Sequence, residues 1–374
     1  MPATKAAISP TEAASPTVAE ATLTPVPTET PSPWLAAPVI PAPQFISLKM
    51  ISALEGWAIA AQAVLRTQDG GQTWHDVSMP GVSNLVSGTG FSALDENTAW
   101  VLVTDPNAPL DAGTLYRTAD GGLTWETIPV AFGGGSLEFV DESVGWVMSS
   151  LGVGAGSMAV AIFRSADGGL TWNQVYTNDP NLPEAADSLP LGGLKNNLTA
   201  KDAQTAWVAG VIYAPDTIYL YKSDDGGQTW ASQSLPPATG IPNFDASTPG
   251  LILLNASEAV LPVQFYGDNQ QTGFYRSDDG GDTWAFAALL SGTGFLDFGS
   301  PMDGFFWNGQ ALYVSTDGGV SWIPQQPNIN FGDRVMLMDF ADAQHGWIVT
   351  YEDNGQRFLY TTEDGGKTWE QLAP

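Results

Sequence analysis

One eight-residue motif, Ser/Thr-x-Asp-Gly-Gly-x-Ser/Thr-Trp, occurs seven times in this chain and constrains its fold more than any other feature. The first copy runs from Thr67 to Trp74. Copies return about every fifty residues, a spacing typical of proteins that repeat one supersecondary unit. The motif aspartates are Asp69, Asp120, Asp167, Asp225, Asp279, Asp317 and Asp364.

The Asp-Gly-Gly core of the motif predicts a tight hairpin turn, because glycine adopts positive φ without a steric penalty. We expect the Asp carboxylate to accept hydrogen bonds from backbone N–H groups of its own turn, and the hydroxyl residues to close the loop from either side. The Trp then begins the outgoing strand with a large apolar surface. A feature repeated in every unit serves the unit, so we interpret the seven aspartates as structural rather than as ligands or catalysts.

These seven motifs resemble the Asp-box, or bacterial neuraminidase repeat, of sialidases, sortilins, some xyloglucan hydrolases and photosystem II assembly factor-like proteins. In those families the box lies at the outer hairpin of a β-propeller blade, away from the active face. From about residue 44 onward, the chain is similar to the photosystem II assembly/stability factor-like propellers in its blade number, box count and Gly-Trp strands. The resemblance implies the docking of a partner polypeptide.

Each repeat contains four stretches of strand-forming composition. An apolar first strand such as 45–51 precedes a Gly-Trp or Ala-Trp second strand such as 56–60; the third runs into the motif and the fourth leaves it. The sequence therefore predicts an all-β fold, a seven-bladed β-propeller of four-stranded antiparallel blades over residues 44–374. In the fifth repeat, Ala259-Val260-Leu261 stands where the second-strand Trp belongs, and in the sixth we assign that role to Trp307.

The motif and second-strand tryptophans are predicted to pack between blades. Two alternatives remain for closing the ring. Either the first and last repeats pack end to end, or the segment from Trp34 to Ile40 adds an edge strand. Pro38 disfavours the second alternative, since proline cannot donate a ladder hydrogen bond.

Residues 1–43 differ in composition from everything after them. Ser-Pro and Thr-Pro pairs alternate with Ala, Thr and Glu, a composition that cannot bury enough apolar surface to fold. We expect a disordered Thr/Pro/Ala-rich stalk with no signal peptide in the sequence as given. Such a stalk is typical of exported, surface-tethered proteins and predicts an extracytoplasmic location, secreted or at the cell surface. The alternative is a linker left over from another domain.

Charge and composition exclude several kinds of partner. There are 40 acidic and 12 basic residues, a formal net charge of −28. Five bases recur three residues before a motif aspartate, where we expect them near carboxylates: Arg66, Arg117, Arg164, Lys222 and Arg276. The few remaining bases disfavour nucleic acid and anionic membrane surfaces. No apolar stretch is long enough to span a membrane. Without cysteine and with two histidines, no metal site or cofactor is predicted.

Loop length varies at one end of the repeats only. The motif turn and the turn between first and second strands are constant and share one end, which we call the turn end. The turns between second and third strands and the connections between repeats vary and share the other, the loop end. Binding residues concentrate on variable loops held by a rigid scaffold. The candidates there are Tyr213, Asp216, Tyr266, Asp268, Phe331, Asp333, Tyr351 and Asp353. A solvated acidic rim without a ligand is the alternative.

The function predicted is a non-enzymatic extracytoplasmic interaction module that binds a protein with a basic or cationic surface at the loop end. The alternative is a glycoside hydrolase or carbohydrate-binding propeller, sialidase-like or xyloglucanase-like. Sialidase chemistry is disfavoured, because the Arg-Ile-Pro motif and the arginine triad are missing. Xyloglucanase-like enzymes join two such propellers, and this chain has one. We name no catalytic residue, since a facing carboxylate pair is invisible without coordinates.

Overall fold

The computed structural model describes Met1 and residues 36–372, with gaps at 83–84, 86–88, 105–111, 242 and 268. Most of the predicted stalk, including Trp34, therefore lies outside the described residues. The chain divides into two compact units, Met1–Pro33 and Trp34–Pro374. All the strands of the described residues belong to the second unit. None of the described helices is long and apolar enough to cross a membrane.

The all-β fold expected from the sequence is confirmed. In the described residues the strands form five four-stranded antiparallel sheets and one sheet of nine strands. The first two sheets contain β1 (Phe45–Met50), β2 (Gly56–Ala60), β3 (Ala63–Thr67), β4 (His75–Asp76), β5 (Gly90–Ala93), β6 (Ala99–Val103), β7 (Gly113–Thr118) and β8 (Glu126–Val130). The third contains β9 (Gly135–Phe139), β10 (Gly145–Gly154), β11 (Ser157–Ser165) and β12 (Asn173–Thr177).

The nine-stranded sheet follows in the chain and precedes the last two sheets. It contains β13 (Leu194–Ala200), β14 (Ala206–Val211), β15 (Leu220–Ser223), β16 (Ala231–Ser232), β17 (Asp245–Ser247), β18 (Ile252–Leu253), β19 (Ala259–Tyr266), β20 (Gln271–Ser277) and β21 (Ala285–Ser291). The last two contain β22 (Phe295–Phe298), β23 (Gly304–Trp307), β24 (Leu312–Ser315), β25 (Ile323–Gln325), the 3₁₀ helix η2 (Gly332–Arg334), β26 (Val335–Phe340), β27 (Gly346–Tyr351), β28 (Arg357–Thr362) and β29 (Glu370–Gln371).

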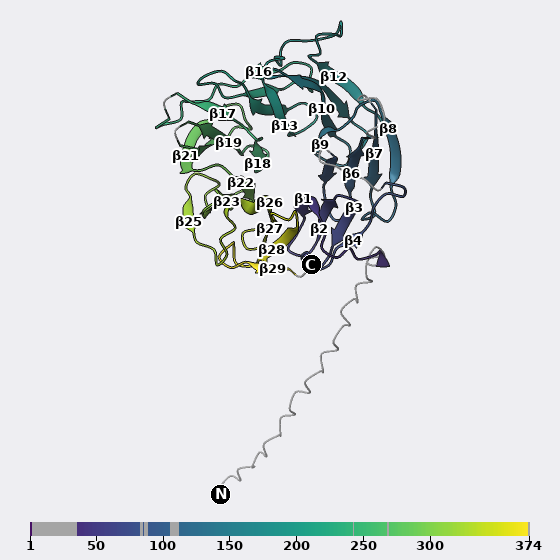
Figure 1. Cartoon of the computed structure of the whole chain (residues 1–374), viewed down its shortest axis with the longest axis vertical. Coiled ribbons are helices and arrows are strands. Elements are labelled where there is room, and N and C mark those ends of the chain that lie inside the picture. Colours follow the sequence, from purple (N-terminus) through teal and green to yellow (C-terminus); the bar gives the residue numbers. More distant parts are fainter. Residues whose placement is uncertain are drawn as a thin grey trace. The chain divides into compact units, whose positions relative to one another are not determined.

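The sheets of the second unit are arranged in a ring (Figure 1). Strands β1, β9, β13, β18, β22 and β26 lie towards its centre, and β4, β8, β12, β16, β21, β25 and β29 lie at its rim. Neighbouring strands along the chain pair in each four-stranded sheet, so every connection is a simple antiparallel turn. Radial repetition of this kind leaves only short strand edges exposed.

Strand β17 makes the nine-stranded sheet continuous. It lies in the connection after β16 and pairs with β14 through Val211↔Ser247 and with β19 along its whole length. The Thr248 hydroxyl fixes the connection beside it, because it accepts from the Gly210 N–H at 2.7 Å and donates to the Gly210 carbonyl at 2.8 Å. The sequence had indicated only a variable loop here, since a three-residue pairing has no periodic pattern to reveal it.

Large aromatic side chains fill the joints between sheets. Trp57, Trp100, Trp146, Trp207 and Trp347 are at most 1 % exposed. In the sixth repeat the assignment of Trp307 was wrong. Phe305 takes the second-strand Trp position, because it pairs with the residue directly before the motif Ser. Its ring stacks on Phe340, as the ring of Trp100 stacks on Phe139. Trp307 lies two residues further along β23, towards the loop end.

The ring closes by packing of its first and last sheets. Asp339 on β26 accepts from the backbone N–H of Met50 on β1 at 2.6 Å and pairs with the Lys49 ammonium at 3.1 Å. The Trp347 indole donates to the carbonyl of Gly70 at 2.8 Å. Phe45, Met50, Trp347 and Leu359 share one apolar cluster across this seam.

The segment before β1 also adds an edge pairing, although Pro38 made one unexpected from the sequence. Val39 bridges His75, the Ile40 N–H donates to Trp74 O, and the Asp76 N–H donates to Pro38 O. Proline is tolerated because only its carbonyl is used. The pairing extends the outer edge of the first sheet, beyond β4.

Candidate functional site

At the turn end, each motif aspartate is saturated by its own turn. In all seven copies one carboxylate oxygen accepts from the backbone N–H four residues on, at 2.8–2.9 Å, and the other accepts from that residue's hydroxyl, at 2.5–2.7 Å. The hydroxyl two residues before the Asp donates to it at 2.8–2.9 Å. Both glycines of each turn have φ between +70° and +91°, a region that other residues rarely adopt.

These hydrogen bonds decide the charge state of the carboxylates. Partial burial acts to raise the pKa of Asp225, but hydrogen bonds from Thr229, Ser223 and Gln228 outweigh it and lower the pKa. The same direction holds for Asp120, Asp167, Asp279, Asp317 and Asp364. These six carboxylates are ionised, and all seven are occupied by their own turns, which leaves them poorly suited to bind a ligand.

Four of the five basic side chains that precede the motif aspartates by three residues lie near a tryptophan ring. The Arg66 guanidinium lies 4.4 Å above the Trp57 ring. Arg117, Arg164 and Lys222 lie at 5.7–5.9 Å from the second-strand Trp of their own sheets, a distance at which a cation is attracted to the ring.

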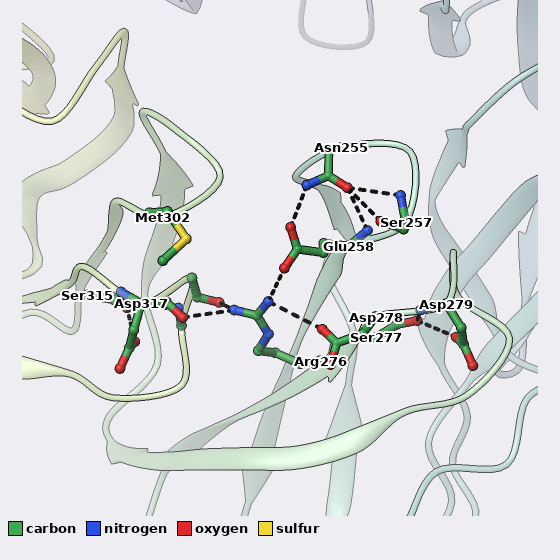
Figure 2. A network of polar contacts seen from close by, with 12 residues as sticks. Asn255, Ser257, Glu258, Arg276, Ser277, Asp278, Asp279, Met302, Ser315 and Asp317 are labelled. Atoms are coloured by element: carbon green, nitrogen blue, oxygen red, sulfur yellow. Dashed lines mark hydrogen bonds and ion pairs between the residues drawn. The ribbon is translucent and has the colours of Figure 1, made fainter.

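The fifth repeat lacks that Trp and uses a different arrangement. Figure 2 shows Arg276 between Glu258 and Asp278 of its own repeat and the next motif turn. Its guanidinium pairs with the Glu258 carboxylate at 2.9 Å and donates to the Asp317 carbonyl at 3.0 Å. A basic side chain at this position therefore joins one repeat to the next.

The loop end offers a pocket of about 620 Å³. It is lined by β13, β18, β19, β20, β22, β23, η2 and β26, and by the connections before β18, before β22 and after β23. The described lining residues are Asn197, Pro249, Gly250, Leu251, Ile252, Pro262, Gln264, Thr272, Thr293, Gly294, Phe295, Leu296, Phe306, Trp307, Gly309, Gly332, Asp333 and Val335. Asp333 alone among them is ionisable. In the described part of the chain no hydrogen bond or ion pair engages its exposed carboxylate, so the pocket carries one free negative charge.

The eight predicted binding residues are not all brought together. Asp333 lines the pocket, and the Tyr266 hydroxyl donates to its lining residue Gln264 at 2.8 Å. Tyr351 and Asp353 are exposed at the turn between β27 and β28, and Tyr213 is 71 % exposed. Asp268 lies outside the described residues.

Two of the eight have structural roles. Phe331 is 1 % exposed and meets Trp307, Tyr360 and Trp369 edge-on, so it belongs to the core and is not available at the surface. Asp216 has a φ of +56° and exchanges two hydrogen bonds with the Phe244 backbone, both at 2.9 Å. It fastens the turn after β14 to the connection after β16.

Sequence reasoning missed a set of polar residues on the central strands. The second-to-last residue of the first strand of a sheet accepts from a backbone N–H of the next such strand: Ser92 from Phe139, Glu138 from Ala200, Asp297 from Phe340 and Asp339 from Met50. Burial raises the pKa of Glu138 to about 7, and burial together with the neighbouring Asp339 charge raises the pKa of Asp297. In these four strands, a polar residue directly before the last apolar residue was the available signal.

Asp297 on β22 and Asp339 on β26 are neighbouring carboxylates, and the charge of Asp339 acts on Asp297. Both are engaged, each by a backbone N–H at 2.6 Å, and Asp339 also by Lys49. In the described residues, no group of three or more His, Asp or Glu side chains is placed to hold a metal ion.

No protein-family model and no curated protein sequence matches this chain. Among solved structures it is similar to "YCF48 bound to D1 peptide" at 18 % identity and a TM-score of 0.56, over 87 % of this chain and 94 % of that one. A YCF48 from Cyanidioschyzon merolae matches at 15 % identity and a TM-score of 0.52, over 87 % and 97 % of the two chains.

A third similar structure is the GH74 xyloglucanase from Xanthomonas campestris, at 15 % identity and a TM-score of 0.56. The match covers 90 % of this chain but only 55 % of the enzyme, so the chain spans about half of that protein. At these identities the likeness concerns the fold alone, and it agrees with the ring of antiparallel sheets. The chain is a β-propeller, as the sequence predicted.

Proposed function

We propose that this chain is a seven-bladed Asp-box propeller that acts as a non-enzymatic interaction module and binds a partner polypeptide at its loop end. The nine-stranded sheet then comprises two blades joined by β17. In support, that sheet contains two motif turns, at Asp225 and Asp279, whereas each four-stranded sheet contains one.

The observation that carries the proposal is the pocket with its single free carboxylate, Asp333. Glycines occupy four of the lining positions, Gly250, Gly294, Gly309 and Gly332, so the wall there is backbone rather than side chain. Backbone N–H and C=O groups are partners for another polypeptide backbone. Apolar lining from Phe295, which is 38 % exposed, adds contact area for an apolar side chain.

Charge selects the kind of polypeptide. The Asp333 carboxylate has no cation of its own, and a net charge of −28 attracts cations over long range. A segment that pairs one Lys or Arg with apolar residues complements both features. The similar YCF48 structure holds a D1 peptide, which supports a propeller of this kind as a peptide receptor.

A carbohydrate ligand is the second candidate, because the exposed Phe295 ring in the pocket offers an apolar face of the kind sugars pack on. Hydrolysis of that ligand by the usual mechanism would require two carboxylates flanking the bond. Asp333 alone is ionisable among the described lining residues, so the pocket supports binding rather than cleavage.

We place this activity outside the cytoplasm, secreted or at the cell surface. The support is compositional: residues 1–43 have the Thr/Pro-rich character of an extracellular stalk. Protease protection of whole cells of the native host, compared with lysed cells, tests this location.

Selection of a random-peptide display library on the full chain tests the binding activity. We expect the enriched peptides to carry a Lys or Arg beside apolar residues. Their affinity is expected to fall about tenfold for Asp333→Asn, because a charge-assisted hydrogen bond contributes about 1.5 kcal/mol or more. Glu126→Gln is the matched control, since Glu126 is an exposed carboxylate on β8, outside the pocket.

Peptides without basic residues, or equal losses from the two variants, would contradict the proposal. Binding of xyloglucan oligosaccharides in competition with the selected peptides would instead favour the carbohydrate candidate.

A further inference from the structure

The hairpin of β10 and β11 extends further than the other turns between second and third strands in the described residues. Its strands have ten and nine residues. Strand β10 pairs with β9 only from Gly145 to Ser149, while its pairing with β11 continues to Gly154. Residues Ser150–Gly154, which we call the β10 edge, thus have a strand partner on one side only within the described part of the chain.

Hydrogen bonds on the far side of the hairpin show where the β10 edge directs its backbone. Val153 lies opposite Met158. The Met158 N–H donates away from β10, to Leu191 O at 3.0 Å. Directly opposed residues of an antiparallel ladder exchange both of their hydrogen bonds or neither. Val153 therefore directs its N–H and C=O away from β11, towards the unpaired side.

The β10 edge lacks the features that normally protect an unpaired strand. From Ser149 to Phe163 there is no charged residue and no proline. Val153 is 64 % exposed. Native proteins block exposed edges with charges, prolines or covering loops, because an unpaired edge is a template for another strand.

Hydrogen bonds also anchor the start of β11, and an anchored strand loses less entropy when another strand binds beside it. The buried Lys195 ammonium donates to the carbonyls of Met158, Pro190, Leu191 and Gly193 at 2.6–3.1 Å. These contacts fix the start of β11, beside the hairpin turn, to the connection before β13. On the turn itself, the exposed Tyr213 ring lies beside Gly156, where an added Cβ would meet it at 3.0 Å.

We propose that the β10 edge is a second docking site, which takes an extended segment of a partner polypeptide as an added strand. The partner segment is basic. A second copy of this chain would bring its own charge of −28 to the edge and be repelled, whereas a segment rich in Lys or Arg is attracted. The exposed Val153 and Tyr213 side chains then contact the apolar residues that alternate with the basic ones.

Hydrogen exchange of the full chain with a short synthetic peptide of alternating Lys and Val tests the proposal. We expect the Val153 amide to become at least about tenfold more protected, because it gains a hydrogen-bond partner. The same peptide with N-methylated backbone nitrogens is the control, since it keeps the side chains and loses the donors; we expect it not to protect the edge.

A protein variant makes the test independent of the peptide design. Val153→Pro removes the outward N–H without removing a hydrogen bond between β10 and β11, and is expected to weaken peptide binding about tenfold. Val153→Ala keeps the N–H and is expected to stay within about threefold of the wild type, since only side-chain contact is lost. Val153→Lys keeps the N–H too, and its charge is expected to weaken binding of the basic peptide.

An unprotected Val153 amide, or equal protection by the N-methylated peptide, overturns the proposal. A dimer of the wild type that Val153→Pro converts to monomer in sedimentation assigns the edge to a second copy and overturns the basic partner. The pocket is tested separately: Asp333→Asn is expected to leave protection of the β10 edge unchanged, so either site can fail while the other holds.

Discussion

The turn end and the loop end of the same sheets obey different rules. At the turn end, seven turns repeat the same hydrogen bonds to within 0.2 Å, and the first Gly of each turn donates to the neighbouring turn at 2.7–2.9 Å. At the loop end, one connection forms β17, another forms η2, and the β10–β11 hairpin projects as an unpaired edge. The comparison separates residues that hold the repeat from residues that distinguish one repeat from another.

The carboxylates at the two ends also differ in how many hydrogen bonds they accept. Those of the motif turns are fully engaged, whereas that of Asp333 has no partner in the described residues. Substitutions at the turn end should therefore cost stability and leave binding intact, and those at the loop end should do the opposite.

The largest effect is expected from Trp146→Ala. Trp146 is fully buried, and its indole donates to Asp202 O of the next repeat at 3.1 Å. Removing it should lower the free energy of unfolding by about 3–5 kcal/mol, measured by urea denaturation, because a cavity is left between sheets. Peptide affinity of the folded fraction should not change. Tyr213→Ala is the loop-end control, and a loss of similar size there would break the comparison.

Glu138→Gln should show a stability difference that depends on pH. The folded-state pKa of Glu138, about 7, lies above the ordinary 4.5, so the folded chain binds the carboxyl proton more tightly than the unfolded chain does. The wild type therefore loses stability as the pH rises from 4.5 to about 7. Gln keeps an acceptor for the Ala200 N–H without ionising. The variant should be more stable than the wild type above pH 7, by at most about 3 kcal/mol, and similar near pH 4. Glu126→Gln, on an exposed strand, should show no such trend in thermal melts across pH.

Asp225→Ala should cost about 1–3 kcal/mol, because the Thr229 and Gln228 N–H groups lose their acceptor. Since hydrogen bonding lowers the pKa of Asp225, its contribution is present at neutral pH and lost as the pH falls into the acid range. Chemical denaturation at pH 7 and in acid measures both statements. Reduced peptide binding at an unchanged melting temperature would show that this turn has a functional role.

The smallest effect on stability is expected from charge reversal at the loop end. Asp333→Lys should change the free energy of unfolding by less than about 0.5 kcal/mol, as exposed substitutions do. It should slow association with the basic peptides, and by more than Glu126→Lys does. The difference should shrink at high salt, where the screening length falls below about 8 Å. Salt-independent association would leave this end with a purely apolar role.

The sequence predicts the turn end better than the loop end. The motif turns, the strand order and the all-β ring depend on local patterns that return in each repeat, and these were predictable. Phe331 was misassigned because an apolar residue in a variable loop reads alike whether it enters the core or lines a pocket. Trp307 was misassigned because it follows two phenylalanines on the same strand, and the first of them takes the expected Trp position. The pairing of Pro38 with Asp76 and that of β17 depend on segments far apart in sequence, which no local pattern encodes.

The seam that closes the ring joins Met50 to Asp339, residues 289 apart in sequence. The apolar face around Phe45 and Met50 is synthesised first and covered last, since its partner sheet begins at Val335. Contacts of such long separation form slowly, and the exposed face is prone to misassembly until they do. Ribosome-bound chains that end before β26 should therefore bind chaperones through β1.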